Sequence, residues 1–573
     1  MNNILKMRTV SKIVFSVAVC ALLLLAPACN DILNVETERV LFTEDNKLNK
    51  ADDLYYSAFG ILRQFQSLGE KYVILGELRA DLMDVTVESD VDLQAISNHT
   101  VTADNPYIAT IDYYAVINNC NYYIQHADTS ISKGGYKILY TEYALIKALR
   151  AWTYFQLAVN YGKATYLEKP IISLADMNEN HPVYDINQLI DVLIADLAPY
   201  VDVDLGGSFG EQGYTLPYKW FVPVQLMLAD LLLWKGDYGS AAYLYYVYIN
   251  NHAIKPTNSN RGWESESFEM TWGSWPRFND IEENEFLYGM FYSVEKGFAC
   301  PLMNKLSAKV PGNRYSLYML KPSNASQTFW DNQIYTYYNE RTREINYKQG
   351  DLRGGPALEL YPNWITYGGG GTQLFGGSYN YYINEEDTMP YINKFVDMDI
   401  FSSLGRYYSS TSSLYLYRAS TLYLRFAEAL NRSDKPTMAF AILKYGLNRQ
   451  NLALYVDRDE IASTPFDFSG VFYDNAGGIR QHGLGWPQYD TTYVIPSGEK
   501  LTRQDTINFV EDKILEELAL ETAFEGNRFG DLMRFSQRRG DPSILANAVA
   551  KKNPALLGKL MNPNNWFLPT PTD

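Results

Sequence analysis

Residues 140–162 read YTEYALIKALRAWTYFQLAVNYG, and this stretch decides the fold. Small residues recur in it at spacings of four and three, which places them on one stripe of a helix. Leu145, Leu149 and Trp152 form a neighbouring stripe of large side chains. A small face lets a second helix approach closely, so the pattern predicts a helical hairpin completed by residues 186–197. The small stripe, with one aromatic, consists of Ala144, Ala148, Ala151, Phe155 and Ala158.

Three further helical hairpins are predicted along the chain, over residues 223–248, 422–447 and 507–538. Such small-large helix pairs are typical of tetratricopeptide repeats, yet about 170 residues separate the second hairpin from the third. An isolated hairpin cannot bury both of its faces. The pairs must therefore pack together, which predicts a mostly α fold with four repeat-like hairpins and long loop-rich insertions.

The predicted domain spans residues 51–573 and has parts of different character. A helical part covers 51–255, a loop-rich aromatic segment covers 256–420, and C-terminal repeats cover 421–573 with an insertion at 457–503. Gly368 to Gly371 predict irregular backbone. Loops on a rigid scaffold commonly carry binding residues. The aromatic candidates for ligand binding are Trp330, Tyr361, Trp364 and Tyr367, followed by Trp272 and Trp275, with ordinary packing as the alternative for each.

The N-terminus predicts export and lipidation. Basic residues precede an apolar stretch from Ile13 to Leu25, and small residues then lead to Cys29. This is the pattern of a signal peptide over residues 1–28, too short for a membrane span. Cleavage would leave Cys29 to carry lipid, with a tether over residues 29–50. Several acyl chains together give stable anchoring.

Charge and cysteine content exclude several classes of protein. The chain has 49 basic and 66 acidic residues, a net charge of −17, which repels nucleic acid and anionic lipid. Contact with a membrane is therefore expected only through the lipid anchor. Besides Cys29 and a cysteine in the signal peptide, only Cys120 and Cys300 remain. They are predicted to be two buried thiols, although export leaves a disulfide open.

No catalytic motif is present in the sequence, and the protein is predicted not to be an enzyme. The five histidines form no HExxH motif, and neither GxSxG nor a P-loop occurs. A carboxylate pair of a glycosidase cannot be singled out among 66 acids. No cofactor is predicted. The acid clusters at 84–92, 385–387 and 397–399 could ligate calcium, but a solvated face is the preferred interpretation and no calcium site is predicted.

Five motifs in a fixed order resemble the SusD/RagB family of Bacteroidetes outer-membrane lipoproteins. The resemblance implies a lipoprotein that captures nutrients and delivers them to a SusC-like TonB-dependent transporter. Its substrates are usually oligosaccharides, with oligopeptides in the RagB branch. A structural scaffold without ligand and a hydrolase remain further alternatives. The motifs are Cys29–Glu36, Lys147–Gly162, Tyr423–Leu430, Glu521–Leu532 and Phe567–Pro571.

The resemblance also implies ligand contacts before the first repeat. Arg79 and Asp81 match the polar part of a stretch that faces ligand in the family. An aromatic residue commonly stands shortly before Tyr114 in the family, but this chain has Thr110 there and Tyr107 is the closest substitute. This departure weakens the expected glycan platform and favours the oligopeptide alternative.

Overall fold

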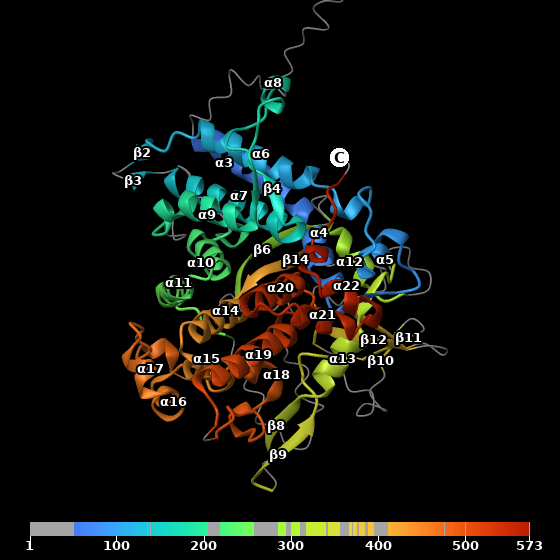
Figure 1. Ribbon diagram of the computed structural model, residues 1–573, viewed down its shortest axis with the longest axis vertical. Coiled ribbons are helices and arrows are strands. Elements are labelled where there is room, and N and C mark those ends of the chain that lie inside the picture. Colours follow the sequence, from blue (N-terminus) through green and yellow to red (C-terminus); the bar gives the residue numbers. More distant parts are fainter. Residues whose placement is uncertain are drawn as a thin grey trace, which may run out of the picture. The chain divides into compact units, whose positions relative to one another are not determined.

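Helix α7 runs from Tyr140 to Tyr161 in the computed structural model and packs among its helical neighbours in the upper part of the view in Figure 1. Its small stripe is buried, with Ala144, Ala148 and Ala151 fully inaccessible. Gly162 ends the helix with a φ of 73°, a left-handed conformation that a residue without Cβ adopts at no steric cost. The predicted hairpin is confirmed, because α9 over Ile186–Leu197 packs against α7.

The structure describes residues 51–571 except for several gaps, and residues 50–573 form one compact unit. The gaps fall mainly in the aromatic segment. They comprise residues 134–135, 138, 204–217, 257–284, 294–298, 310–316, 340–341, 356–365, 369–370, 375–376, 384–387, 393, 395–410, 475 and 499.

The other three predicted hairpins are also formed, and they pack in chain order. Helix α11 of the second hairpin contacts α14 of the third, so the separated pairs join into one layer (Figure 1). Each apolar face is thereby covered, as an isolated pair could not achieve. These helices are α10 Val224–Lys235, α11 Tyr238–Asn251, α14 Ala419–Arg432, α15 Pro436–Lys444, α19 Arg503–Thr522 and α20 Arg528–Arg539.

Further helices flank this layer at both ends of the chain, within the aromatic segment and within the insertion. The insertion, predicted to be loop-like, contains α17, α18 and several tight turns. The flanking helices are α3 Ala51–Phe65, α4 Gly69–Val73, α5 Val91–Ser97, α6 Ile111–His126, α8 Leu174–Met177, α12 Pro301–Leu306, α13 Asn324–Asp331, α16 Arg449–Tyr455, α17 Arg458–Ala462, α18 Gln481–Leu484, α21 Ser543–Ala550 and α22 Leu557–Leu560.

The described part of the aromatic segment is largely β structure, which corrects the expectation of loops. β10 to β13 form a four-stranded antiparallel sheet, and β14 pairs with β6. Gly368 and Gly371, predicted to be irregular, face each other across the β10–β11 pair. The strands are β1 Met83–Val85, β2 Ser132–Lys133, β3 Tyr136–Lys137, β4 Lys163–Thr165, β5 Val183–Asp185, β6 Phe286–Ser293, β7 Leu320–Pro322, β8 Ile334–Asn339, β9 Glu344–Gln349, β10 Thr366–Gly368, β11 Gly371–Leu374, β12 Tyr379–Ile383, β13 Thr388–Ile392 and β14 Thr411–Arg418.

A buried ionic network fastens this β region to α19. Arg353 pairs with Asp351, Glu517 and Glu521, and Arg418 pairs with Glu521. All of these side chains are almost inaccessible, so each charge requires its partners. Burial alone would raise the pKa of Glu521, but the surrounding cations hold it well below its ordinary value. Further members of the network are Glu285, Lys394, Arg480, His482 and Glu525.

A π-helix over Ile74–Leu78 joins the N-terminal part to the turn between α19 and α20. A Cβ on Gly76 would lie 1.9 Å from the carbonyl oxygen of Gly526, so the two backbones touch. The carboxylate of Glu77 accepts hydrogen bonds from the N–H groups of Gly526 at 2.8 Å and Asn527 at 3.1 Å. Segments about 450 residues apart are thus held by direct backbone contact.

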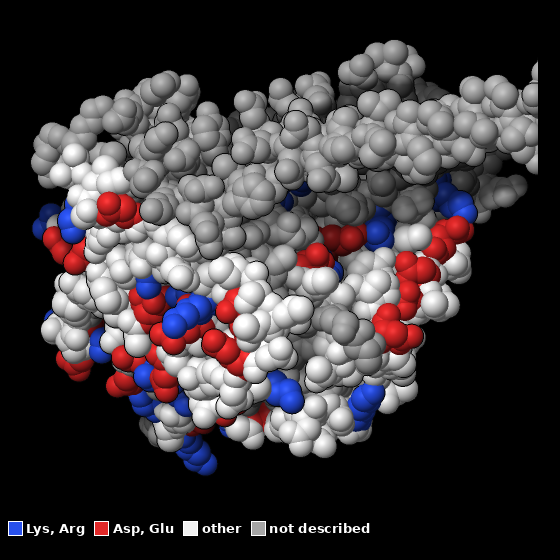
Figure 2. All heavy atoms as spheres, turned by 90° about the horizontal axis from the view of Figure 1, so that it is seen from above, with Lys and Arg blue, Asp and Glu red and all other residues white. Residues whose placement is uncertain are grey.

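The structure bears on two further expectations from the sequence. Cys120 and Cys300 are free and buried, as predicted, and burial raises the pKa of each thiol to about 12. Within the described residues, no helix is both long and apolar enough to cross a bilayer. On the face seen from above, acidic and basic side chains are intermixed over part of the described surface, and uncharged side chains cover much of the rest (Figure 2).

Candidate ligand-binding site

Two distant segments meet where β1 pairs with β7 in antiparallel register, Asp84 opposite Lys321. β7 also contacts β13, so the four-stranded sheet lies beside the segment that follows Arg79. The loop after β1 is fastened to the other segment, since the Thr86 N–H donates to the Met319 carbonyl at 3.1 Å. The N-terminal residues and the aromatic segment, both predicted to contact ligand, are therefore neighbours.

Tyr107 is the described candidate whose ring remains partly accessible at this junction. Its hydroxyl donates to Asp90 Oδ2 at 3.2 Å, and the Lys305 ammonium lies 5.7 Å from its ring centroid. Lys305 in turn pairs with Glu70 at 2.6 Å. Burial, together with Asp90 and Glu70, raises the pKa of Tyr107, which keeps the hydroxyl protonated as a donor. We call Tyr107, Glu70, Asp90 and Lys305 the Tyr107 site.

Sequence reasoning missed Lys305 and Glu70, because no local pattern connects residues 235 positions apart. Glu70 comes from α4, Tyr107 from a short 3-10 turn and Lys305 from α12. Asn105 fixes the turn, because its side chain accepts the Tyr107 N–H at 3.0 Å. The site therefore combines an aromatic face with charges of both signs, an arrangement suited to binding a polar ligand.

Arg79 and Asp81 lie inside the fold, and this placement does not support their predicted ligand role. Arg79 donates to the Asn160 side chain at 2.6 Å and to the Trp566 carbonyl at 3.1 Å. Burial lowers the pKa of Arg79 to about 10. Asp81 forms a two-pronged ion pair with Arg528, both hydrogen bonds being 2.8 Å long. These residues tie the N-terminal segment to the C-terminal helices.

Trp330 is also enclosed, with 1% of its surface exposed. Its indole N–H donates to the Leu520 carbonyl at 3.3 Å, and Tyr379 lies 5.6 Å from the ring. Gly354 packs against the Trp330 side chain so closely that a Cβ there would approach to 2.7 Å. No face of this ring is open to a ligand, so its placement favours the packing alternative.

The remaining candidates belong to the aromatic segment and to the N-terminus. Trp272, Trp275, Tyr361, Trp364 and the lipidation residue Cys29 lie outside the described residues. Tyr367 lies on β10, in the sheet whose β13 edge contacts β7, although its side chain is not described. The aromatic candidates of this segment stay predictions.

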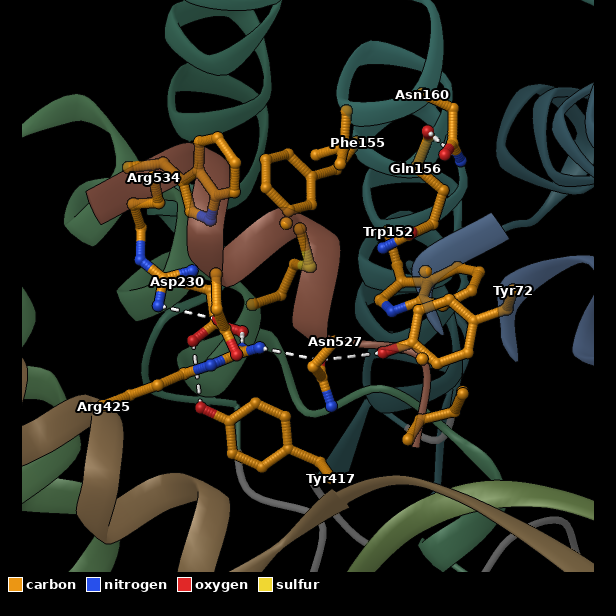
Figure 3. Close-up of a pocket in the computed structure, with 18 of the residues that line it drawn as sticks. Tyr72, Trp152, Phe155, Gln156, Asn160, Asp230, Tyr417, Arg425, Asn527 and Arg534 are labelled. Atoms are coloured by element: carbon orange, nitrogen blue, oxygen red, sulfur yellow. Dashed lines mark hydrogen bonds and ion pairs between the residues drawn. The ribbon is translucent and has the colours of Figure 1, made fainter. Parts of the chain in front are cut away.

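A second concavity lies between α7, α10, α14 and α20 (Figure 3). The Arg425 guanidinium pairs with Asp230 and donates to Asn527 Oδ1 at 3.2 Å, and the Tyr72 hydroxyl donates to the same atom at 2.9 Å. Burial raises the pKa of Asp230, although Arg425 opposes this. The cavity volume is about 50 Å³. That is room for a few water molecules and too little for an oligosaccharide.

The acid clusters take structural roles where they are described. Asp90 accepts the Leu93 N–H at 2.8 Å at the start of α5, and Asp84 accepts the Val85 N–H at 2.8 Å. The clusters at 385–387 and 397–399 lie outside the described residues. Among the residues that the structure places, no group of three or more His, Cys, Asp or Glu side chains is arranged to hold a metal ion.

Comparison with known proteins identifies the fold. The chain is similar to a SusD superfamily protein of Bacteroides thetaiotaomicron, with a TM-score of 0.55, 19% identity and coverage of 92% of this chain and 96% of that one. For a SusD superfamily protein of Bacteroides fragilis, the TM-score is 0.59 and the identity is 14%, with coverage of 91% of this chain and 96% of that one. For a candidate sugar-binding protein of Bacteroides vulgatus, the TM-score is 0.50 and the identity is 17%, with coverage of 85% of this chain and 87% of that one.

At the level of sequence, a search of curated proteins finds no match. The model of the SusD family, in contrast, matches residues 328–556, which include the third and the fourth hairpin. The structural similarities extend beyond this stretch to the N-terminal helices. Residues 328–556 thus match the SusD family in sequence, and the chain as a whole has a fold similar to that of solved SusD superfamily proteins.

Proposed function

We propose that this protein captures oligosaccharides at the cell surface and passes them to a SusC-like TonB-dependent transporter. The observation that carries the proposal is the Tyr107 site, an accessible aromatic ring surrounded by polar groups at the junction of two distant segments. The match of residues 328–556 to the model of the SusD family supports it, as does similarity to a candidate sugar-binding protein.

Capture at this site requires binding and no covalent step. A pyranose ring presents an apolar C–H face that stacks on tyrosine, while its hydroxyls bond to flanking polar groups. Glu70 accepts hydrogen bonds from hydroxyls, and Lys305 donates to their oxygens. The proposal assigns the protein no catalytic role, no cofactor and no bound calcium.

One observation favours oligopeptides as a second candidate ligand. The Tyr107 site carries Lys305 beside Glu70 and Asp90, charges of both signs that match the two termini or charged side chains of a short peptide. A neutral sugar needs no such charges. Binding of oligosaccharides and of oligopeptides is therefore measured side by side to decide the ligand class.

The remaining parts of the proposal concern export and partner. We assign residues 1–28 to a signal peptide, residues 29–50 to a tether lipidated at Cys29, and residues 51–573 to a single SusD-like domain. The protein is then held on the outer membrane by lipid alone. Tyr361, Trp364 and Tyr367 are proposed as further ligand contacts, and Trp272 and Trp275 follow them. A copurifying TonB-dependent barrel would support the partner assignment.

Titration calorimetry of the purified mature protein tests the ligand. Neutral hexasaccharides and tripeptides are titrated into the wild type and into Tyr107→Ala, Tyr107→Phe and Tyr243→Ala. Tyr243 is a matched control, because 51% of its surface is exposed on α11. We expect hexasaccharide binding that Tyr107→Ala weakens about tenfold, while Tyr107→Phe and the control retain it. If only tripeptides bind, the ligand is a peptide and not a sugar. If Tyr243→Ala weakens binding as much as Tyr107→Ala does, the Tyr107 site is not the binding site.

A further inference from the structure

The β8–β9 hairpin carries aromatic side chains on one face, away from the Tyr107 site. Figure 1 shows the hairpin at the lower end of the domain, whereas α5 and α12 lie to the right. Thr336 pairs with Tyr347 across the two strands. Because side chains alternate along a strand, Tyr338 lies on the same face as Thr336 and Tyr347. One face of the hairpin therefore presents two tyrosines.

A turn of the insertion adds two more rings to this face. The Trp486 N–H donates to the Thr336 carbonyl at 2.9 Å, which lays the turn along β8. Gly485 makes this approach possible: its φ is 67°, and a Cβ there would lie 2.1 Å from the Thr336 oxygen. Tyr489 follows at the end of a short 3-10 turn. Residues about 150 positions apart are thus brought to one surface.

The four rings form a continuous cluster that we call the aromatic ridge: Tyr338, Tyr347, Trp486 and Tyr489. Tyr338 and Trp486 are nearly parallel, at 12°, with centroids 6.0 Å apart. The ring centroids of Trp486 and Tyr489 lie 5.5 Å apart, and the two ring planes are tilted by 33°. The Tyr347 hydroxyl donates a hydrogen bond to the Tyr489 carbonyl at 3.2 Å. Tyr347 is 52% exposed and Tyr489 is 45% exposed. Tyr338 and Trp486 are half-buried.

The chemistry of this face indicates what it binds. The cluster presents aromatic surface to solvent, and such contiguous exposed patches mark interaction sites. The ridge face of the hairpin carries no charge, since its other members are Ile334, Thr336, Ile345 and Gln349. Glu344 and Lys348 are on the opposite face. Aromatic faces with an exposed neutral amide suit the C–H faces and hydroxyls of a neutral sugar.

We propose that the aromatic ridge is a second carbohydrate-contact surface, which takes a neutral oligosaccharide by stacking sugar rings on Trp486, Tyr489 and Tyr347. The inference rests on the proposed function and extends it, because it assigns sugar contact to a surface separate from the Tyr107 site. Neighbouring rings whose centroids lie 5.5 to 6.0 Å apart, one pair nearly parallel and the other tilted by 33°, support successive sugar units better than one isolated ring does. Gln349 lies on the same face of the hairpin, and the exposed Gln488 stands between Trp486 and Tyr489 in the sequence, so both can offer amides to a bound sugar.

The test uses maltohexaose, cellohexaose and xylohexaose as neutral probes and hexagalacturonate as an anionic one. Each is titrated into the wild type, the double variant Tyr347→Ala/Tyr489→Ala, Tyr107→Ala and the control Tyr243→Ala. Both ridge tyrosines are well exposed, so the double variant should fold, and a thermal melt verifies this. We expect at least one neutral probe to bind about three- to tenfold more weakly for each ring removed. The control should bind as the wild type does.

The outcomes separate this inference from the proposed function. If Tyr107→Ala weakens every probe that binds while the folded double variant binds all of them normally, the ridge is not a sugar surface and the proposed function stands. If the double variant loses hexagalacturonate as strongly as neutral probes, the assignment to a neutral ligand is wrong. If the wild type binds none of the sugars, the proposed capture of oligosaccharides fails, and the ridge fails with it.

Discussion

Asp81 illustrates how a single buried charge can be mistaken for a ligand contact. In sequence, Arg79 and Asp81 form a polar stretch that the family resemblance assigns to ligand binding. In the fold, the two carboxylate oxygens of Asp81 are both bonded to Arg528. Burial would raise the pKa of Asp81, but the positive charge of Arg528 has the larger effect and lowers it, so the carboxylate stays charged. Its role is to join distant segments.

Asp81→Asn should therefore reduce stability and leave ligand affinity unchanged. It removes from the buried Arg528 guanidinium the carboxylate that is hydrogen-bonded to it, at a cost of about 3–5 kcal/mol in the free energy of unfolding. Urea denaturation measures this change. Asp191→Asn is the control, because Asp191 is 59% exposed beside Lys235 and its loss should cost less than about 1 kcal/mol. A stable Asp81→Asn protein with weakened ligand binding would restore the ligand role.

Trp330→Ala separates packing from ligand contact in the same way. Removal of an enclosed indole leaves a cavity against Tyr379 and Phe524 and should cost about 3–5 kcal/mol. Trp330→Phe retains part of the ring and should cost less. Denaturation and calorimetry are measured on the same preparations. If Trp330→Ala has the unfolding free energy of the wild type but no longer binds sugar, Trp330 contacts ligand as the sequence predicted, and the packing role is wrong.

At the scale of elements, the helices were predictable and the β region was not. Residues 140–161 carry their pattern locally, so spacing and Gly162 suffice to predict α7. The strands of residues 286–418 pair across long distances, as β14 does with β6, and their partners leave no local signal. The Tyr107 site was unpredictable for the same reason, because α4 and α12 come together only in the folded chain.

The contact between the π-helix and the α19–α20 turn depends on Gly76. A methyl group there would overlap the Gly526 backbone, which cannot move aside without disturbing the Glu77 hydrogen bonds. Gly76→Ala should therefore cost about 1–3 kcal/mol, measured by urea denaturation. A Cβ added to Gly60 on α3 would meet no atom within 4 Å, so Gly60→Ala should be neutral or stabilise the helix. Equal effects of the two substitutions would contradict the close approach.

Glu77, which lies in the same π-helix, should make stability depend on pH. Burial raises the pKa of Glu77 to about 7, although backbone hydrogen bonds oppose this. A carboxyl whose pKa is higher in the folded state stabilises the protein below its unfolded pKa, and this contribution is lost as pH rises through about 7. The wild type should therefore lose stability relative to Glu77→Gln between about pH 4.5 and 7, by at most about 3 kcal/mol. A constant difference over this range would show that the carboxyl titrates normally.

On the scale of the whole molecule, one helical layer supports two proposed contact surfaces. The helical pairs form a continuous stack, the π-helix that follows α4 contacts α20, and the ionic network around Arg353 fastens the β region to α19. Sugar contact at the Tyr107 site and at the aromatic ridge would thus occur on parts of one rigid unit. A long oligosaccharide that bridged both surfaces would gain from an effective local concentration, beyond the affinity of either surface alone.

Anchoring by lipid makes a prediction for the entire chain. Cys29 lies outside the described residues, and the proposed attachment runs through the acyl chains that this residue would carry. Each buried methylene contributes about 0.8 kcal/mol, and several chains together give stable attachment. Cys29→Ala should therefore move the protein from the membrane fraction to the soluble fraction. Metabolic labelling with palmitate and intact mass measure the loss of lipid.

The same variant shows whether anchoring and ligand capture are independent. Purified Cys29→Ala protein should bind the neutral hexasaccharides with wild-type affinity, because the Tyr107 site and the aromatic ridge are built from residues of the folded domain. A double variant with Tyr107→Ala should combine soluble location with weakened binding. Membrane retention of Cys29→Ala without acylation would show that another part of the chain, or a protein partner, provides the attachment.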